Sequence, residues 1–164
     1  MARSAILTSL VLSTVLVIAI QAKDEGFNGR WVLDKGSPRP GDAPNNFETR
    51  IKLDGSGVTF ESRFKEPENG VVPLLYLGLM TNRLRLGTDG QEQQNSIGPF
   101  QMASKTTVDG NKMQTDWIAV VKDDQVQGHW TQQLSGDGKH MTWEIRESSS
   151  QGQHAEVTLY FVRK

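Results

Sequence analysis

Apolar side chains recur at every second residue through most of this 164-residue sequence. The stretch from residue 113 to 121 is typical, because its odd positions hold Met113, Thr115, Trp117, Ala119 and Val121. Successive side chains of an extended strand point to opposite faces of a sheet, so this period indicates strands with one buried face. Turn-forming residues separate such stretches about every 8 to 12 residues. The pattern predicts an all-β protein, an antiparallel meander closed into a barrel of about 8 to 10 strands.

The alternating stretches cover residues 27–33, 47–53, 58–64, 83–86, 100–108, 113–121, 126–134, 141–145 and 155–161. Residues 35–46 hold three of the six prolines, which predicts a long loop. Val71–Met80 is apolar on both parities. It fits a strand buried on both sides, a short helix plugging one end of the barrel, or a lid at a ligand mouth, and periodicity does not choose between them.

The first 22 residues have the layout of a secretory signal peptide. Arg3 is followed by an apolar run from Ala5 to Ile20 and then by Gln21 and Ala22. Cleavage after Ala22 would leave residues 23–164 as one barrel domain that is secreted or periplasmic. The alternative is an uncleaved anchor, but a spanning helix needs about 20 apolar residues and this run is shorter. We therefore expect no stable membrane span after cleavage.

Composition excludes several classes of function. The formal net charge is −1, which provides no field for nucleic acid or for an anionic membrane. There is no cysteine, so disulfides, thiol nucleophiles and lipid-modified cysteines are excluded. No phosphate-binding loop, metal-ligand spacing or nucleophile motif is present. We expect a monomer that has no cofactor and no metal and is not an enzyme.

The turns predict which side chains lie next to each other across neighbouring strands. The turn after Val108 places Met102 opposite Trp117, the turn after Val121 places Trp117 opposite Trp130, and the turn after Leu134 places Trp130 opposite Trp143. Opposed side chains lie about 5 Å apart, so the three indoles are expected to form one row. Such a row can be ordinary core or the wall of a ligand cavity, and in a barrel the two are compatible.

The candidate ligand-binding residues are the three tryptophans of this row, two residues expected near a mouth, and two neighbours on the same face. They are Trp117, Trp130, Trp143, Phe60, Tyr76, Met102 and Thr115. The predicted ligand is a small apolar or aromatic molecule. The alternative is a structural or interaction protein of the cell envelope, with a filled barrel and no ligand.

The segment Phe27–Asp34 resembles the Gly-x-Trp opening strand of lipocalins, and more closely that of small exported bacterial lipocalin-like proteins. Chains of that group also close with a hairpin like Leu134–Thr142 and a final apolar strand like Val157–Lys164. The resemblance implies a calycin-type barrel with an interior ligand. It also implies that a basic residue late in the barrel packs across the first indole by a cation–π contact. The residues that would form this structural base are Gly29, Trp31 and Arg163.

A third and weaker hypothesis concerns a histidine on the polar parity. The same register places His129 opposite Glu144, with Asp116 opposite it or diagonal to it. A histidine with two carboxylates is a candidate for hydrolase-type acid–base chemistry or for weak metal binding. The alternative is an ordinary cross-strand polar pair on the solvated face of the sheet.

Overall fold

The computed structural model describes residues 26–36, 45–65, 83–97, 100–121 and 123–164. The ordered elements of these residues are ten strands: β1 (Gly29–Leu33), β2 (Asn45–Asp54), β3 (Gly57–Lys65), β4 (Arg83–Gly87), β5 (Asp89–Ile97), β6 (Phe100–Asp109), β7 (Lys112–Val121), β8 (Asp124–Leu134), β9 (His140–Ser149) and β10 (His154–Arg163). All pairings are antiparallel within one sheet, whose order is β4-β3-β2-β1-β10-β9-β8-β7-β6-β5. The predicted all-β antiparallel meander is therefore confirmed.

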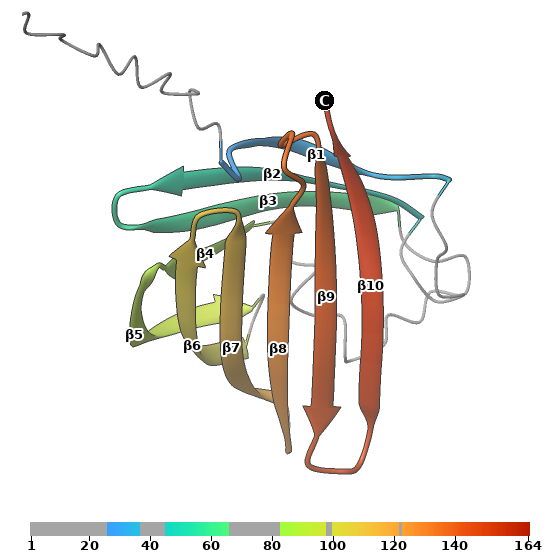
Figure 1. The fold of residues 1–164 in the computed structure, drawn as a ribbon. Helices are drawn as coiled ribbons and strands as arrows, with labels where there is room; N and C mark the ends of the chain where they lie inside the picture. The colour runs from blue at the N-terminus through green and yellow to red at the C-terminus, as the bar shows by residue number, and fades with distance from the viewer. Residues whose placement is uncertain (1–25, 37–44, 66–82, 98–99, 122) are drawn as a thin grey trace, which may run out of the picture.

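The sheet wraps round until it nearly closes into a barrel. Strand β1 pairs with both β2 and β10, which joins the two ends of the chain. In Figure 1, β2 and β3 run across the long strands β6 to β10, so the sheet encloses an interior. The two edge strands, β4 and β5, follow each other through Thr88, but the sheet order contains no ladder between them. At this seam the side chain of Gln93 lies against Gly87.

Burial follows the alternation of the sequence. Along β7, the residues at odd positions from 113 to 121 are buried, while those between them are exposed or half-buried. The same alternation runs along β9 and β10, so one face of every long strand contributes to a common core. Burying a tryptophan removes roughly 150–250 Å² from water, which makes the four indoles the largest single contributions to this core.

The predicted strand pairings are wrong by two residues at each of the three turns. Trp117 lies opposite Gly128 rather than Trp130. The cause is visible at the β6–β7 turn, where Gly110 has a φ of 55° and takes the first central position of the loop. A shift of two residues keeps every side chain on its predicted face.

The correct partners of the remaining residues follow from the same shift. Met102 lies opposite Ala119, Trp130 lies opposite Ile145, and Trp143 lies opposite Gln132. The three later indoles are consequently diagonal neighbours on the inner face rather than directly opposed.

One strand was missed by the sequence analysis. Strand β5 lies between two predicted strands and is polar on both parities. It pairs with β6 alone among the described strands, and Ile97 is its one buried residue. An edge strand with so little burial carries no hydrophobic alternation, so the sequence pattern did not reveal it.

Some predictions lie outside the described residues. These are the signal peptide at residues 1–22, most of the loop at 35–46, and Val71–Met80 with Tyr76. Within the described ranges, no helix has the length and apolar character that a membrane crossing requires.

Candidate functional site

Four aromatic side chains form a continuous wall on the inner face of the barrel. The ring centroids of Trp117 and Trp130 are 5.5 Å apart, and those of Trp130 and Trp143 are 6.0 Å apart. Phe60 on β3 extends the wall, with its ring centroid 5.6 Å from that of Trp143. All four are buried. The Trp130–Trp143 pair is edge-on, a geometry that aromatic pairs prefer, and the other two pairs are tilted.

Two further candidates lie on the same inner face. Met102 on β6 and Thr115 on β7 are both buried. The hydroxyl of Thr115 is 3.0 Å from that of Thr106, so the two buried hydroxyl groups share one hydrogen bond. Thr115 therefore lies at the wall, opposite Trp130, as a satisfied polar group.

A narrow apolar crevice borders the wall at Trp117. It is too narrow to hold a water molecule, so it consists only of gaps between packed side chains. Its lining comes from strands β5 to β8 and consists of Ile97, Phe100, Trp117, Ala119, Val121 and Val126. Sequence reasoning missed the crevice, because two of its lining residues flank the end of the unrecognised strand β5.

A carboxyl group that the sequence analysis also missed lies inside the barrel. Glu147 on β9 is only 3% exposed and shares its face with Trp143 and Ile145. The indole Nε1 of Trp130 donates a hydrogen bond to Oε1 of Glu147 at 3.1 Å. Burial raises the pKa of Glu147 to about 8, and the hydrogen bond from Trp130 only partly opposes this. Glu147 shares the parity of the buried residues Trp143 and Ile145, which was the available signal. It was missed because the predicted strand ended at Ile145.

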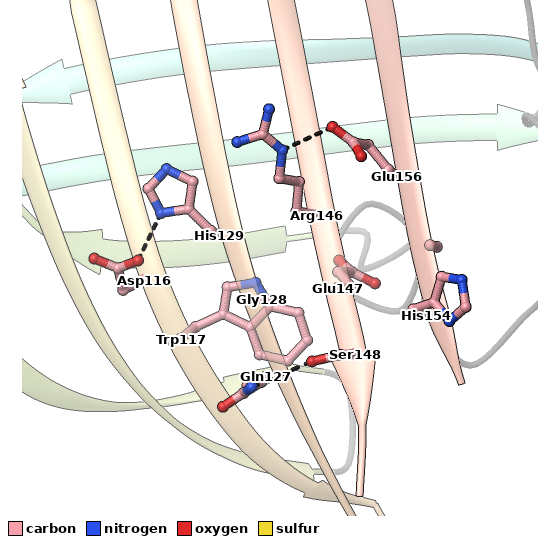
Figure 2. Close-up of a pocket in the computed structure, with 11 residues that line it drawn as sticks. Asp116, Trp117, Gln127, Gly128, His129, Arg146, Glu147, Ser148, His154 and Glu156 are labelled. Carbon is pink, nitrogen blue, oxygen red and sulfur yellow. Dashed lines mark hydrogen bonds and ion pairs between the residues drawn. The ribbon is translucent and has the colours of Figure 1, made fainter. Parts of the chain in front are cut away.

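Gly128 lies between Trp117 and Glu147. It pairs with Trp117 on one side and with Glu147 on the other. Because Gly128 has no side chain, the indole of Trp117 lies across it, and a Cβ at this position would overlap the Nε1 edge of the ring. Figure 2 shows the Trp117 indole over strand β8 at Gly128, with Glu147 on the next strand.

A shallow groove of about 510 Å³ runs across the same strands. It is lined by charged side chains of the outer face and also by Trp117, Gly128 and Glu147. Oδ1 of Asp116 is 2.6 Å from Nδ1 of His129, and Nε of Arg146 is 2.8 Å from Oε1 of Glu156. The expected pairing of His129 with Glu144 is wrong, since His129 faces Arg146.

Glu144 instead faces Thr131 and does not line this groove. The trio of the third hypothesis is therefore not assembled. No group of three or more potential metal ligands occurs among the described residues.

Arg163 covers the indole of Trp31 where the first and last strands of the barrel pair. Cζ of Arg163 lies 4.6 Å from the ring centroid of Trp31, directly across the β1–β10 ladder. Nη2 of Arg163 donates to the carbonyl of Gly26 at 2.5 Å, and Nε1 of Trp31 donates to the carbonyl of Phe27 at 2.9 Å. The aliphatic stem of Arg163 passes Gly29 at ordinary contact distance.

Comparisons with known proteins support the fold. No family model and no curated protein matches the sequence. Crystal structures of two secretory abundant heat soluble proteins from Ramazzottius varieornatus each match with a TM-score of 0.51. Their identities are 12% and 14%, and the matches cover 84% and 85% of this chain and 94% and 96% of theirs.

A third crystal structure, of the wild-type fluorescent protein UnaG, has a TM-score of 0.47 at 12% identity, covering 86% of this chain and 99% of the other. At these identities the likeness to the two heat soluble proteins concerns architecture alone. The chain therefore shares a β-barrel architecture with these two proteins, and it carries an aromatic cluster inside the barrel.

Proposed function

We propose that this protein is a non-enzymatic barrel that binds a small, largely apolar molecule against the interior wall of Trp117, Trp130 and Trp143. The observation that carries the proposal is that this wall borders a narrow apolar crevice at Trp117. Indole faces offer large, rigid contact areas to a ring or an alkyl chain. Interior sites of this kind are common in small β-barrels.

Ligand entry requires side chains to move, because the crevice is too narrow for water. Two of the side chains that line the crevice are placed so that they can move. Phe100 is half-buried, and Ile97 lies on edge strand β5, which has one ladder partner among the described strands. Displacing these two side chains would widen the crevice while leaving the central ladders intact.

Filling the crevice from within tests the proposal. Ala119→Leu adds three carbon atoms beside Trp117, and we expect the affinity for the aromatic probes acetophenone and α-methylstyrene to fall about tenfold or more. Val120→Leu is the matched control, because Val120 is the next residue on β7 and is 61% exposed. Isothermal titration calorimetry gives the affinities, and circular dichroism checks that both variants fold.

A ligand-free barrel of the cell envelope is the second candidate. The observation that favours it is the close packing of the four aromatic rings, which leaves the interior near them well filled. Absence of saturable binding of either probe to the unmodified protein would support this candidate and would contradict ligand binding.

We also propose that residues 1–22 are a cleaved leader and that the barrel works as a monomer in a secreted or periplasmic setting. The layout of Arg3, the apolar run and Ala22 supports this. Intact-mass measurement of protein recovered from its source should give a chain that begins at Lys23. A mass that includes Met1–Ala22 would contradict cleavage.

A further inference from the structure

Two buried polar atoms inside the barrel have no hydrogen-bond partner within the part of the chain that the structure describes. They are Nε1 of Trp117, whose residue is 5% exposed, and Oε2 of Glu147, whose residue is 3% exposed. Buried polar groups in proteins are nearly always paired, and leaving one unpaired is costly. An unpaired donor and an unpaired carboxyl oxygen in one apolar interior therefore call for an explanation.

The two groups converge on the same place. Trp117 and Glu147 flank Gly128 at one level of the sheet, and the indole edge bearing Nε1 lies over Gly128. Figure 2 shows the indole lying over Gly128 on β8 and the carboxyl group of Glu147 on the neighbouring strand β9. The indole fills the bare position at residue 128, and Trp117, Gly128 and Glu147 together line one groove of about 510 Å³.

The surroundings of Glu147 determine whether its carboxyl group is protonated at neutral pH. The inner-facing residues of β10 from 155 to 161 are uncharged, and Asp124, the titratable group on the inner face of β8, accepts a hydrogen bond from Ser150. Asp116, His129, Arg146, His154 and Glu156 belong to the outer face. With no cation on the inner face of these neighbouring strands, burial raises the pKa of Glu147 to about 8 and keeps the group protonated at neutral pH.

The hydrogen bond from Trp130 occupies Oε1, so the proton of the neutral acid resides on Oε2. At neutral pH the site therefore presents two donors, the N–H of Trp117 and the O–H of Glu147. Two convergent donors select a group that accepts hydrogen bonds. An ammonium group offers only donors and would be rejected while Glu147 is neutral.

We propose that Trp117 and Glu147 bind the polar end of the ligand, an uncharged group with an acceptor oxygen such as a ketone or ester carbonyl, while the apolar remainder lies in the crevice beside Trp117. This inference rests on the proposed function, because it assigns the polar contacts of the same interior site. It limits the ligand class to apolar molecules that carry a neutral carbonyl.

The test compares three probes of nearly the same shape. Acetophenone has the carbonyl, α-methylstyrene replaces it by a carbon–carbon double bond, and 1-phenylethylamine carries a cation. Calorimetric titration near pH 6, below the Glu147 pKa of about 8, should show that the protein prefers the ketone to the hydrocarbon by about tenfold or more. This preference should decline as the pH rises past about 8, because ionised Glu147 no longer donates.

Variants separate a hydrogen-bonding role from a packing role. Glu147→Leu and Trp117→Phe each remove one donor, so the preference for the ketone should fall towards one. Glu147→Gln should keep the preference and remove its dependence on pH, because the amide still donates without titrating. Glu144→Leu on the outer face of the same strand is the matched control and should leave the preference unchanged.

The possible results distinguish this inference from the proposed function. Equal binding of ketone and hydrocarbon, or an unchanged preference in Glu147→Leu, would overturn the inference and indicate that buried water satisfies the pair, while ligand binding itself would stand. Tighter binding of the amine than of the ketone would overturn the assignment to an acceptor. If neither the ketone nor the hydrocarbon binds to the unmodified protein, both proposals fail.

Discussion

Glu147 makes the stability of the barrel depend on pH in a direction opposite to that of most carboxylates. Burial raises its pKa from 4.5 to about 8, so the folded state binds the proton more tightly than the unfolded chain does. This contribution to stability is complete below about pH 4.5 and is lost as the pH rises to about 8. A tenfold change in proton affinity corresponds to about 1.4 kcal/mol, so the full effect on the free energy of unfolding amounts to several kcal/mol.

Replacing Glu147 by glutamine should remove that dependence. We expect Glu147→Gln to unfold at a higher urea concentration than the unmodified protein above about pH 8, with the difference shrinking towards about pH 4.5. Urea titrations across this range give the two free energies of unfolding. Glu144→Gln, at an exposed position of β9, should show no such trend. A difference that stays constant with pH would contradict a buried, titrating Glu147.

Gly128 should tolerate no side chain while Trp117 keeps its position. A Cβ at residue 128 would overlap the indole, so Gly128→Ala should lower the free energy of unfolding by roughly 1–3 kcal/mol. The cost should be smaller in a Trp117→Leu background, because the overlapping ring is gone. The double-mutant cycle measures this coupling, and Gly136→Ala, where a Cβ meets no atom within 4 Å, is the control.

At the scale of elements, the sequence predicted the faces of the strands better than their alignment. The inward positions of Trp117, Trp130 and Trp143 followed from parity alone. Their partners did not, because alignment depends on which turn residue adopts a left-handed conformation. At the β6–β7 turn that residue is Gly110, which takes the first central position of the loop. In an Asp-Gly hairpin turn, glycine usually takes the second central position.

The β6–β7 turn provides a direct test of this explanation. Gly110 and Gly55 both have open space where a Cβ would lie, but only Gly110 has a positive φ, of 55°. Gly110→Ala should therefore destabilise the protein by about 1 kcal/mol more than Gly55→Ala, through backbone conformation alone. Urea unfolding of the two variants gives the comparison, and equal costs would contradict it.

The candidate site was only partly predictable, for a physical reason. Its aromatic residues lie on the apolar parity and were found. Glu147 was not, because a carboxyl group on that parity normally marks the end of a buried stretch. Its burial depends on contacts that no local pattern records: the bare Gly128 beside it and the N–H of Trp130.

At the scale of the whole molecule, the barrel depends on the junction between its first and last strands. Arg163 connects them, through its position over Trp31 and its hydrogen bond to Gly26. Replacing Arg163 by methionine keeps the aliphatic stem but removes both charged contacts, and we expect a loss of roughly 1–3 kcal/mol in the free energy of unfolding.

The matched control for this junction is Arg146→Met. Arg146 forms an ion pair with Glu156 in which both side chains are largely exposed, and such pairs contribute little. Thermal or urea unfolding should therefore rank the Arg163 variant clearly below the Arg146 variant. Equal stabilities would show that the junction does not rely on the guanidinium group.

The seam between β4 and β5 bears on how copies of this protein behave together. A strand with an unpaired edge exposes backbone amides and carbonyls that a strand of another chain can extend into an aggregate. Strand β5 places exposed polar residues there, among them Glu92 and Gln94, and charged or polar edges disfavour such intermolecular growth. The same polar composition that hides β5 from the hydrophobic pattern therefore disfavours pairing with another chain along the edge of β5 that has no partner among the described strands.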